Sequence, residues 1–418
     1  MIGLRYPLTI AALPATRDAT VLLETRAVRA FGDGLISVVL ATYLASWGLS
    51  STEVGVVLAT TLLGSAVATL LVGVHGHRIG RRRLLRWASL SMIATGLGFA
   101  ACSGFWPLLL IAFVGTLNPS TGDVSVFLSM EQALLPGTTR DSTRTAVFTR
   151  YAMIGTLVAA VGSLCAGAPA WLGGLLGASA TTSQRSVFLG YAVLGVVVFM
   201  RYARLSPAIE AAGNTYGALG QSRPIVYRLA ALFSLDAFGG GFTITAIVVL
   251  WLQERFDLSL ALTGATFFWA GVLSAFSALV AARLARRIGL IRTMVFTHLP
   301  ANGFLILAAF MPTAPLAIAA LLARSALSQM DVPARTSYVM AIVSPAERPA
   351  AASITNVPRS LASAIPPILA GWLLAHSTFG WPLVIGGALR VFYDLGLLHQ
   401  FRHVQPPEEA GRERCRTA

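Results

Sequence analysis

The segment Gly73-Val74-His75-Gly76-His77-Arg78-Ile79-Gly80-Arg81-Arg82-Arg83 is strongly basic and lies between two long apolar runs. It predicts a short turn between two membrane helices. Arginine clusters stay on the cytoplasmic side, because carrying them across a bilayer is unfavourable. The turn recurs 209 residues later, where Arg287-Ile288-Gly289 matches Arg78-Ile79-Gly80. A basic turn repeated at half the chain length predicts a duplicated membrane protein.

The composition favours a chain whose main solvent is lipid. Of the 418 residues, 56% are hydrophobic and 11% are charged, whereas soluble domains carry about a quarter charged residues. The net charge of +14 comes from arginine, since the sequence contains no lysine. These arginines lie in short loops between apolar segments, where membrane topology accounts for them. We therefore expect membrane lipid, and no nucleic acid, as a partner.

Twelve segments are apolar enough to span a bilayer, which takes about 20 residues. The expected spans are 27–47, 54–76, 84–102, 106–130, 146–168, 187–202, 229–252, 261–282, 291–311, 316–341, 353–375 and 381–398. The polar stretch between the sixth and seventh spans, rich in glycine and proline, is too broken to cross a membrane. We therefore predict an all-α polytopic membrane protein with twelve transmembrane helices. Its two pseudo-symmetric six-helix halves are residues 1–203 and 228–418, joined by a cytoplasmic linker of residues 204–227.

The arginines also predict the topology. Both termini and every second loop carry them, whereas the opposite loops hold only Arg185 and Arg255. This distribution fits an even number of spans with both termini in the cytoplasm, in a cell (inner or plasma) membrane.

Further positions repeat at the same offset of 209. Pro136 matches Pro345, and Gly162 matches Gly371. Parallel six-helix repeats are one known plan of secondary transporters, with the substrate site near the bilayer midplane between the halves.

These features resemble the major facilitator superfamily over essentially the whole chain. The family's loop between the second and third helices reads Gly-x-x-x-Asp-Arg-x-Gly-Arg-Arg, and the matching residues here are Gly73, Arg78, Gly80, Arg81 and Arg82. The resemblance implies a gating loop whose carboxylate helps to latch the outward-open state. His77 replaces that aspartate, which weakens the implied latch. The glycine-rich fifth span also lacks the proline that family antiporters often carry.

Ionisable side chains inside spans are the default candidates for a transport site, because each costs about 2.5–3.5 kcal/mol at mid-helix and usually faces a cavity. Asp33 lies between two glycines in the first span; its structural alternative is a pair with Arg29. Asp123 and Asp331 occupy nearly equivalent repeat positions, as carboxylates of a proton-coupled carrier could. For Asp331, a salt bridge to Arg324 or Arg335 is the alternative.

Four further groups complete the candidates. Asp236 precedes a glycine cluster in the seventh span and is expected to line the cavity, and Arg324 lies deep in the tenth span and needs a partner. Arg150 and Arg359 are repeat equivalents. Each either binds a substrate anion or a carboxylate bidentately, or latches helices at the cytoplasmic gate.

Three other charged groups are expected to be structural. Glu131 is expected to pair with Arg140 or Arg144 at the interface. Arg390 and Asp394 are spaced i,i+4 in the last span and are expected to neutralise each other.

We therefore expect a secondary active transporter that moves a small-molecule substrate by alternating access, with protons as the coupling ion. Export of drug-like or toxic compounds is the leading specific expectation. An organic- or inorganic-anion carrier or an uptake system is the alternative, and a non-transporting membrane receptor or scaffold is the alternative of another class. The sequence shows no phosphate-binding loop, hydrolase motif or metal-ligand spacing, so we predict no enzyme activity, cofactor or metal. A monomer is expected.

Overall fold

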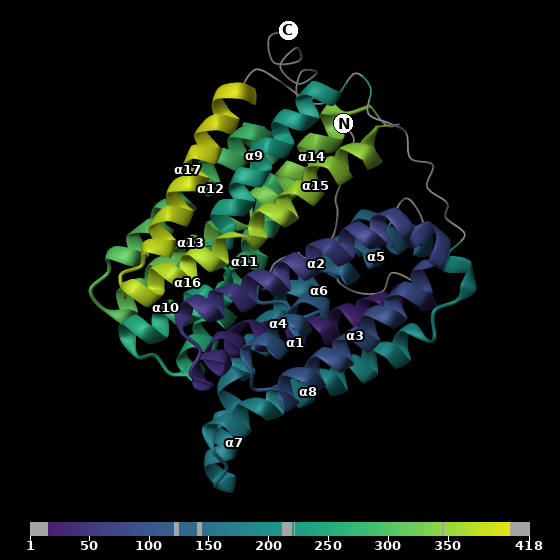
Figure 1. The fold of residues 1–418 in the computed structure, drawn as a ribbon. Helices are drawn as coiled ribbons and strands as arrows, with labels where there is room; N and C mark the ends of the chain where they lie inside the picture. Colours follow the sequence, from purple (N-terminus) through teal and green to yellow (C-terminus); the bar gives the residue numbers. More distant parts are fainter. Residues whose placement is uncertain are drawn as a thin grey trace.

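The protein folds into two bundles of helices, seen in a computed structural model that describes residues 16–120, 125–139, 144–210, 220, 222–344 and 347–401. These described residues contain helices and turns but no strand. Figure 1 shows the purple-to-teal first half and the green-to-yellow second half as separate bundles that meet along one side. The predicted all-α architecture with two halves is confirmed.

The helices of the first half are α1 (Arg17–Ser46), α2 (Ser51–Ile79), α3 (Arg81–Ala101), α4 (Phe105–Val114), α5 (Val126–Leu134), α6 (Arg144–Leu164), α7 (Ala168–Leu176) and α8 (Ala180–Tyr202). Those of the second half are α9 (Arg223–Gly241), α10 (Thr245–Phe256), α11 (Leu260–Ile288), α12 (Leu290–Phe310), α13 (Ala314–Ser328), α14 (Asp331–Ile342), α15 (Arg348–Ala364), α16 (Pro366–His376) and α17 (Trp381–Phe401). Ten described stretches are long and apolar enough to cross a membrane. The pairs α4–α5 and α13–α14 account for the other two spans.

Four spans predicted as continuous helices are instead broken into two. The breaks separate α4 from α5, α9 from α10, α13 from α14 and α15 from α16. Prolines lie at or beside three of them, at Pro119, Pro333 and Pro366, where a missing N–H and a bulky ring interrupt the helical ladder. The break after α9 follows three consecutive glycines, which are poor helix formers. The short helix α7, which the sequence analysis did not anticipate, follows α6 after the single 3-10 turn Cys165–Gly167.

The internal repeat is visible in the positions where helices begin and end. The helices α11 and α12 begin and end 209 residues after α2 and α3, respectively. The residue between each pair of helices is a glycine with positive φ, 88° at Gly80 and 89° at Gly289. Only glycine adopts this conformation readily, so the same turn is built twice.

The halves make close helix crossings near the arginine-poor loops. A Cβ added to Gly371 of α16 would lie 2.2 Å from the carbonyl oxygen of Ser51 in α2. A Cβ added to Gly264 of α11 would lie 2.3 Å from the carbonyl oxygen of Ser163 in α6. Small residues at these crossings let the backbones approach closely, as is common between membrane helices.

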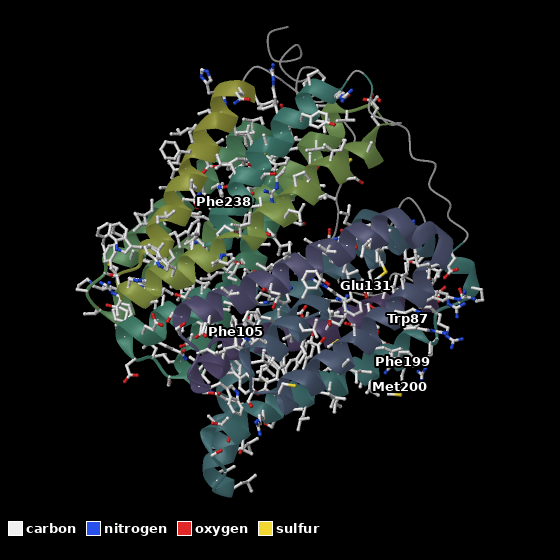
Figure 2. All side chains as sticks on the ribbon, viewed as in Figure 1. Trp87, Phe105, Glu131, Phe199, Met200 and Phe238 are labelled. Carbon is white, nitrogen blue, oxygen red and sulfur yellow. The ribbon has the colours of Figure 1, made fainter. Side chains whose placement is uncertain are left out.

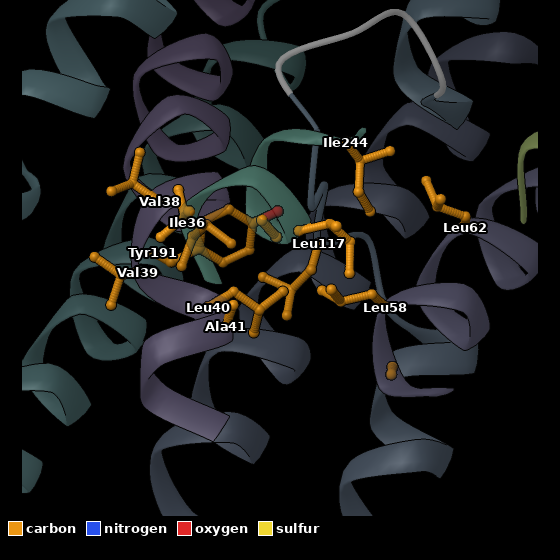
Figure 3. Packing of buried hydrophobic residues seen from close by; sticks show 14 of the residues in the cluster. Ile36, Val38, Val39, Leu40, Ala41, Leu58, Leu62, Leu117, Tyr191 and Ile244 are labelled. Carbon is orange, nitrogen blue, oxygen red and sulfur yellow. The ribbon is translucent and has the colours of Figure 1, made fainter. Parts of the chain in front are cut away.

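The two halves also meet where their helices are broken. The amide of Ala246 at the start of α10 donates a 3.1 Å hydrogen bond to the carbonyl oxygen of Pro119, in the segment after α4. Ile244, just before α10, belongs to the same buried cluster as Leu58 and Leu117 of the first half (Figure 3). One backbone donor and one backbone acceptor at the two breaks therefore satisfy each other, as a low-dielectric interior favours.

The linker is tied to both halves by hydrogen bonds. Ser206 donates to Asp18 in α1 through its amide and its hydroxyl, at 2.9 and 2.5 Å. Glu210 accepts from the amide of Arg82, 2.9 Å away, beside the basic turn. On the other half, the Ser222 side chain and the Gly220 amide donate to Glu347 and lower the pKa of its carboxyl.

Candidate functional site

The first half contains a buried carboxylate surrounded by donors. Glu131 on α5 (labelled in Figure 2) is fully buried. It forms an ion pair with the equally buried Arg29 of α1. Thr25 and the Tyr202 hydroxyl donate to one carboxylate oxygen at 2.8 and 2.6 Å, and the Tyr151 hydroxyl donates to the other. Helices α1, α5, α6 and α8 are joined through this one side chain.

Glu131 is therefore not the partner of interfacial arginines that the sequence analysis expected. Its partner Arg29 is 102 residues away in the sequence and also packs over the ring of Phe127, 4.4 Å from the centroid. The carboxylate accepts from four donors, which satisfies its capacity. We interpret this cluster as the polar element that holds the first bundle together.

Asp33 lies one helical turn beyond Arg29. It is half-buried and close enough to Arg29, Arg26 and Glu131 to interact with them electrostatically. Since Arg29 is held by Glu131, the simple pair between Asp33 and Arg29 does not form among the described contacts. Asp33 is thus a carboxylate at the edge of the cluster rather than within it.

The second half contains a larger network of charges near the middle of its spans. Asp236 of α9 accepts a 2.9 Å hydrogen bond from Arg335 of α14, and Arg335 also lies 3.7 Å from Asp331. All three side chains are at least nine-tenths buried. The structure therefore brings together two of the carboxylates singled out in the sequence, with Arg335 between them.

A histidine extends this network. His298 of α12 lies with its Nδ1 2.9 Å from one oxygen of Asp394 on α17, and its Nε2 is 3.9 Å from Asp236. The Asn302 amide donates a 3.2 Å hydrogen bond to the second oxygen of Asp394. The imidazole therefore lies between two carboxylates from different helices.

The expected pair between Arg390 and Asp394 does not form. Asp394 faces His298 and Asn302, whereas the Nε of Arg390 lies 3.6 Å from Asp236. The two residues share one helix face at i,i+4 spacing, but their partners lie on different neighbouring helices. Helix α17 thereby contacts α12 through its carboxylate and α9 through its guanidinium.

Two further arginines approach Asp236. Arg324 of α13 is half-buried and interacts electrostatically with Asp236 and with Arg390, without an ion pair or hydrogen bond among the described residues. Arg359 of α15 also lies within electrostatic range of Asp236. Its repeat equivalent Arg150 is half-buried on α6, and both arginines have interaction partners.

The remaining sequence candidates are only partly visible. Asp123 lies outside the described residues. Gly73 is exposed with open space around it, and the backbone at His77 and Arg78 continues α2. Arg81 donates a long hydrogen bond of 3.4 Å to the carbonyl oxygen of Ala133.

The sequence analysis did not single out His298 or Asn302. Both lie near Pro300 in the middle of an apolar helix, and a polar pair four residues apart in such a place was the available signal. Within the described part of the chain, no group of three or more histidine, cysteine or acidic side chains is arranged to hold a metal ion.

Repeated six-helix halves, broken spans and charges buried at midspan define a membrane fold of the secondary-transporter type. The model of the Major Facilitator Superfamily matches residues 25–327 and 229–414. The chain belongs to this family.

The chain is also similar to individual proteins of known sequence or structure. The uncharacterized membrane protein YJR124C of Saccharomyces cerevisiae is 25% identical over 427 residues, covering 93% of this chain and 94% of that protein. A bacterial homolog of the human lysosomal transporter Spinster, solved in an inward-facing and occupied conformation, superposes with a TM-score of 0.71 at 14% identity, covering 92% and 96% of the two chains. A D-xylose–proton symporter gives 0.71 at 16% identity, covering 93% and 98%. These structures share the fold.

Proposed function

We propose that the protein is a proton-coupled secondary transporter that moves a small solute by alternating access. Family membership and the two-half fold support transport. The position of His298 between Asp394 and Asp236 is the observation that supports proton coupling. Histidine is the side chain whose charge ordinarily changes between pH 5 and 8.

The proton would change how three helices hold together. A protonated His298 can donate from both ring nitrogens, to Asp394 of α17 and toward Asp236 of α9, whereas neutral imidazole can donate from only one. Asp236 is shared with Arg335 and Arg390, so a change at the imidazole redistributes the contacts of α14 and α17 as well. Protonation could thus bias the balance between inward- and outward-facing states by differential contacts.

The test uses reconstituted vesicles, after a thermal-shift screen with anions, amines and drug-like cations has found a transported ligand. His298→Gln should abolish accumulation driven by a pH gradient while leaving exchange of ligand across the membrane. His376→Gln is the matched control, because His376 is exposed at the end of α16. Full accumulation by His298→Gln would refute this coupling site, and Asp→Asn variants at Asp33 and Asp331 would then be compared.

Export of drug-like compounds is proposed as the direction of transport. Ligand accumulation in inside-out vesicles that are acidified internally would support it, and accumulation only with the opposite gradient would indicate uptake. A ligand that binds but is never translocated under any gradient would instead favour the receptor alternative.

A further inference from the structure

Arginines outnumber carboxylates in the network around Asp236. Four arginines gather there from α13, α14, α15 and α17, namely Arg324, Arg335, Arg359 and Arg390. The carboxylates of the network are Asp236, Asp331 and Asp394, and the last of these is occupied by His298 and Asn302. Arginine cannot lose its proton in a protein, so this excess of positive charge is permanent.

Arg390 is held only loosely. Its Nε lies 3.6 Å from Asp236, beyond a normal hydrogen bond, and has no hydrogen-bond partner among the described residues. Its Nη2 lies against Gly240 of α9, where an added Cβ would come within 2.5 Å. The glycine thus leaves space for a guanidinium whose one described ion pair is this long contact to Oδ1 of Asp236, a carboxylate whose Oδ2 accepts the short bond from Arg335.

Arg324 is the second under-paired cation. Its Nε is buried without a hydrogen-bond partner in the described chain, and a like charge, Arg390, is among its nearest charged neighbours. The carboxylate near these two guanidiniums is Asp236, which Arg335 also contacts. The first half shows the contrast, because Arg29 there has its own fully buried carboxylate.

We propose that Arg324 and Arg390 together bind an oxyanion group, a carboxylate or a phosphate, of the transported substrate. This proposal rests on the transport function above and specifies its substrate class. The planar fork of each guanidinium matches two oxygens of such a group and gives strong, charge-assisted hydrogen bonds. Both residues lie in the interior of spans, at position 10 of the 21 residues of α17 and position 11 of the 15 of α13. Lipid headgroups lie at the membrane surfaces and are not expected at this depth.

The experiment measures binding by thermal shift on the purified full-length protein, without any gradient and at constant ionic strength. The probes are succinate, inorganic phosphate, chloride and tetraethylammonium. Succinate or phosphate should stabilise the wild type in a saturable manner, and chloride and tetraethylammonium should not. Arg324→Gln and Arg390→Gln should each weaken the apparent affinity about 10-fold to 100-fold, which is the usual effect of losing hydrogen bonds to a charged group.

Arg185→Gln is the matched control. Arg185 also has a buried Nε without a hydrogen-bond partner in the described chain, but it packs over Trp47 near an arginine-poor loop, away from Asp236. It should keep the affinity of the wild type. If a glutamine variant is not monodisperse, the lysine variant replaces it; lysine keeps the charge, loses the fork and should still weaken binding about 10-fold.

Three outcomes would overturn the proposal: no stabilisation by either oxyanion, stabilisation by tetraethylammonium alone, or unchanged affinity in both arginine variants. The binding measurement applies no gradient, so its result does not depend on proton coupling. Unchanged oxyanion affinity in both arginine variants would refute the oxyanion site alone, whereas full gradient-driven accumulation by His298→Gln would refute the coupling site alone.

Discussion

Removing the buried carboxylate of Glu131 should destabilise the first half more than any exposed charge does. The variant Glu131→Gln keeps the size of the side chain but leaves the buried Arg29 without a counter-charge. Breaking a buried ion pair from one side costs about 3–5 kcal/mol, because the remaining charge is uncompensated. The oxygen of the glutamine amide can still accept the hydrogen bonds that the Thr25 and Tyr202 hydroxyls donate.

The assay is thermal unfolding of the purified protein, followed by tryptophan fluorescence. A unit of 150–250 residues loses about 2–4 °C per kcal/mol, so a cost of about 3 kcal/mol predicts a fall in Tm of at least about 6 °C. The control is Glu24→Gln. The carboxylate of Glu24 lies 2.9 Å from the guanidinium of Arg201, but both side chains are about 40% exposed. An exposed pair contributes about 0–1 kcal/mol, so its Tm should barely move.

A double-mutant cycle then isolates the pair. Arg29→Met combined with Glu131→Gln should lower the stability by less than the sum of the two single variants. Each single variant leaves one buried charge uncompensated, whereas the double variant removes both charges. A fall below about 2 °C for Glu131→Gln, or additive effects in the cycle, would refute the assignment of Glu131 as the polar centre of the first bundle.

Three further predictions concern other parts of the chain. The Cβ of Gly371→Ala would lie 2.2 Å from the Ser51 carbonyl oxygen, so the variant should force α16 away from α2. The protein should then shift toward the state open on the arginine-poor side, and cysteines placed in that crossing should be labelled more. Unchanged labelling would contradict this prediction. The lowered pKa of Glu347 means that its stabilisation is present above its unfolded value of 4.5 and is lost as the pH falls through the lower folded value, so the difference in Tm between wild type and Glu347→Gln should vanish in acid; a constant difference would refute it. In intact cells an impermeant maleimide should label Cys102 and not Cys415, and the reverse pattern would overturn the predicted topology.

Hydropathy and arginine placement were enough to predict the spans and the repeat, because both reflect the lipid environment of a whole segment. The breaks within spans were not predicted, since Pro119 or Pro366 alone is compatible with a kinked but continuous helix. The break at Pro119 becomes recognisable only when its free carbonyl meets Ala246 of the other half.

Partners of buried charges were the least predictable feature. Spacing along one helix suggested that Arg390 and Asp394 would pair, but each side chain selects among all neighbours in three dimensions. Asp394 found a histidine on α12, 96 positions away in the sequence. The polar character of Asp236 and its position in the seventh span could be read from the sequence, whereas the four cations around it could not.

The hydrogen bond from Ala246 to Pro119 has a consequence for how the protein can change over evolution. Both of its atoms belong to the main chain, so replacing either side chain does not directly delete it. If the halves separate at this point during transport, this backbone bond must open before water in the widening cavity can satisfy its two groups. Homologous carriers with unrelated substrates could then share one energy barrier to separation of the halves, because this barrier depends on a main-chain hydrogen bond that most amino-acid replacements leave in place. An amide-to-ester replacement at position 246, which removes that donor without changing a side chain, would lower the barrier.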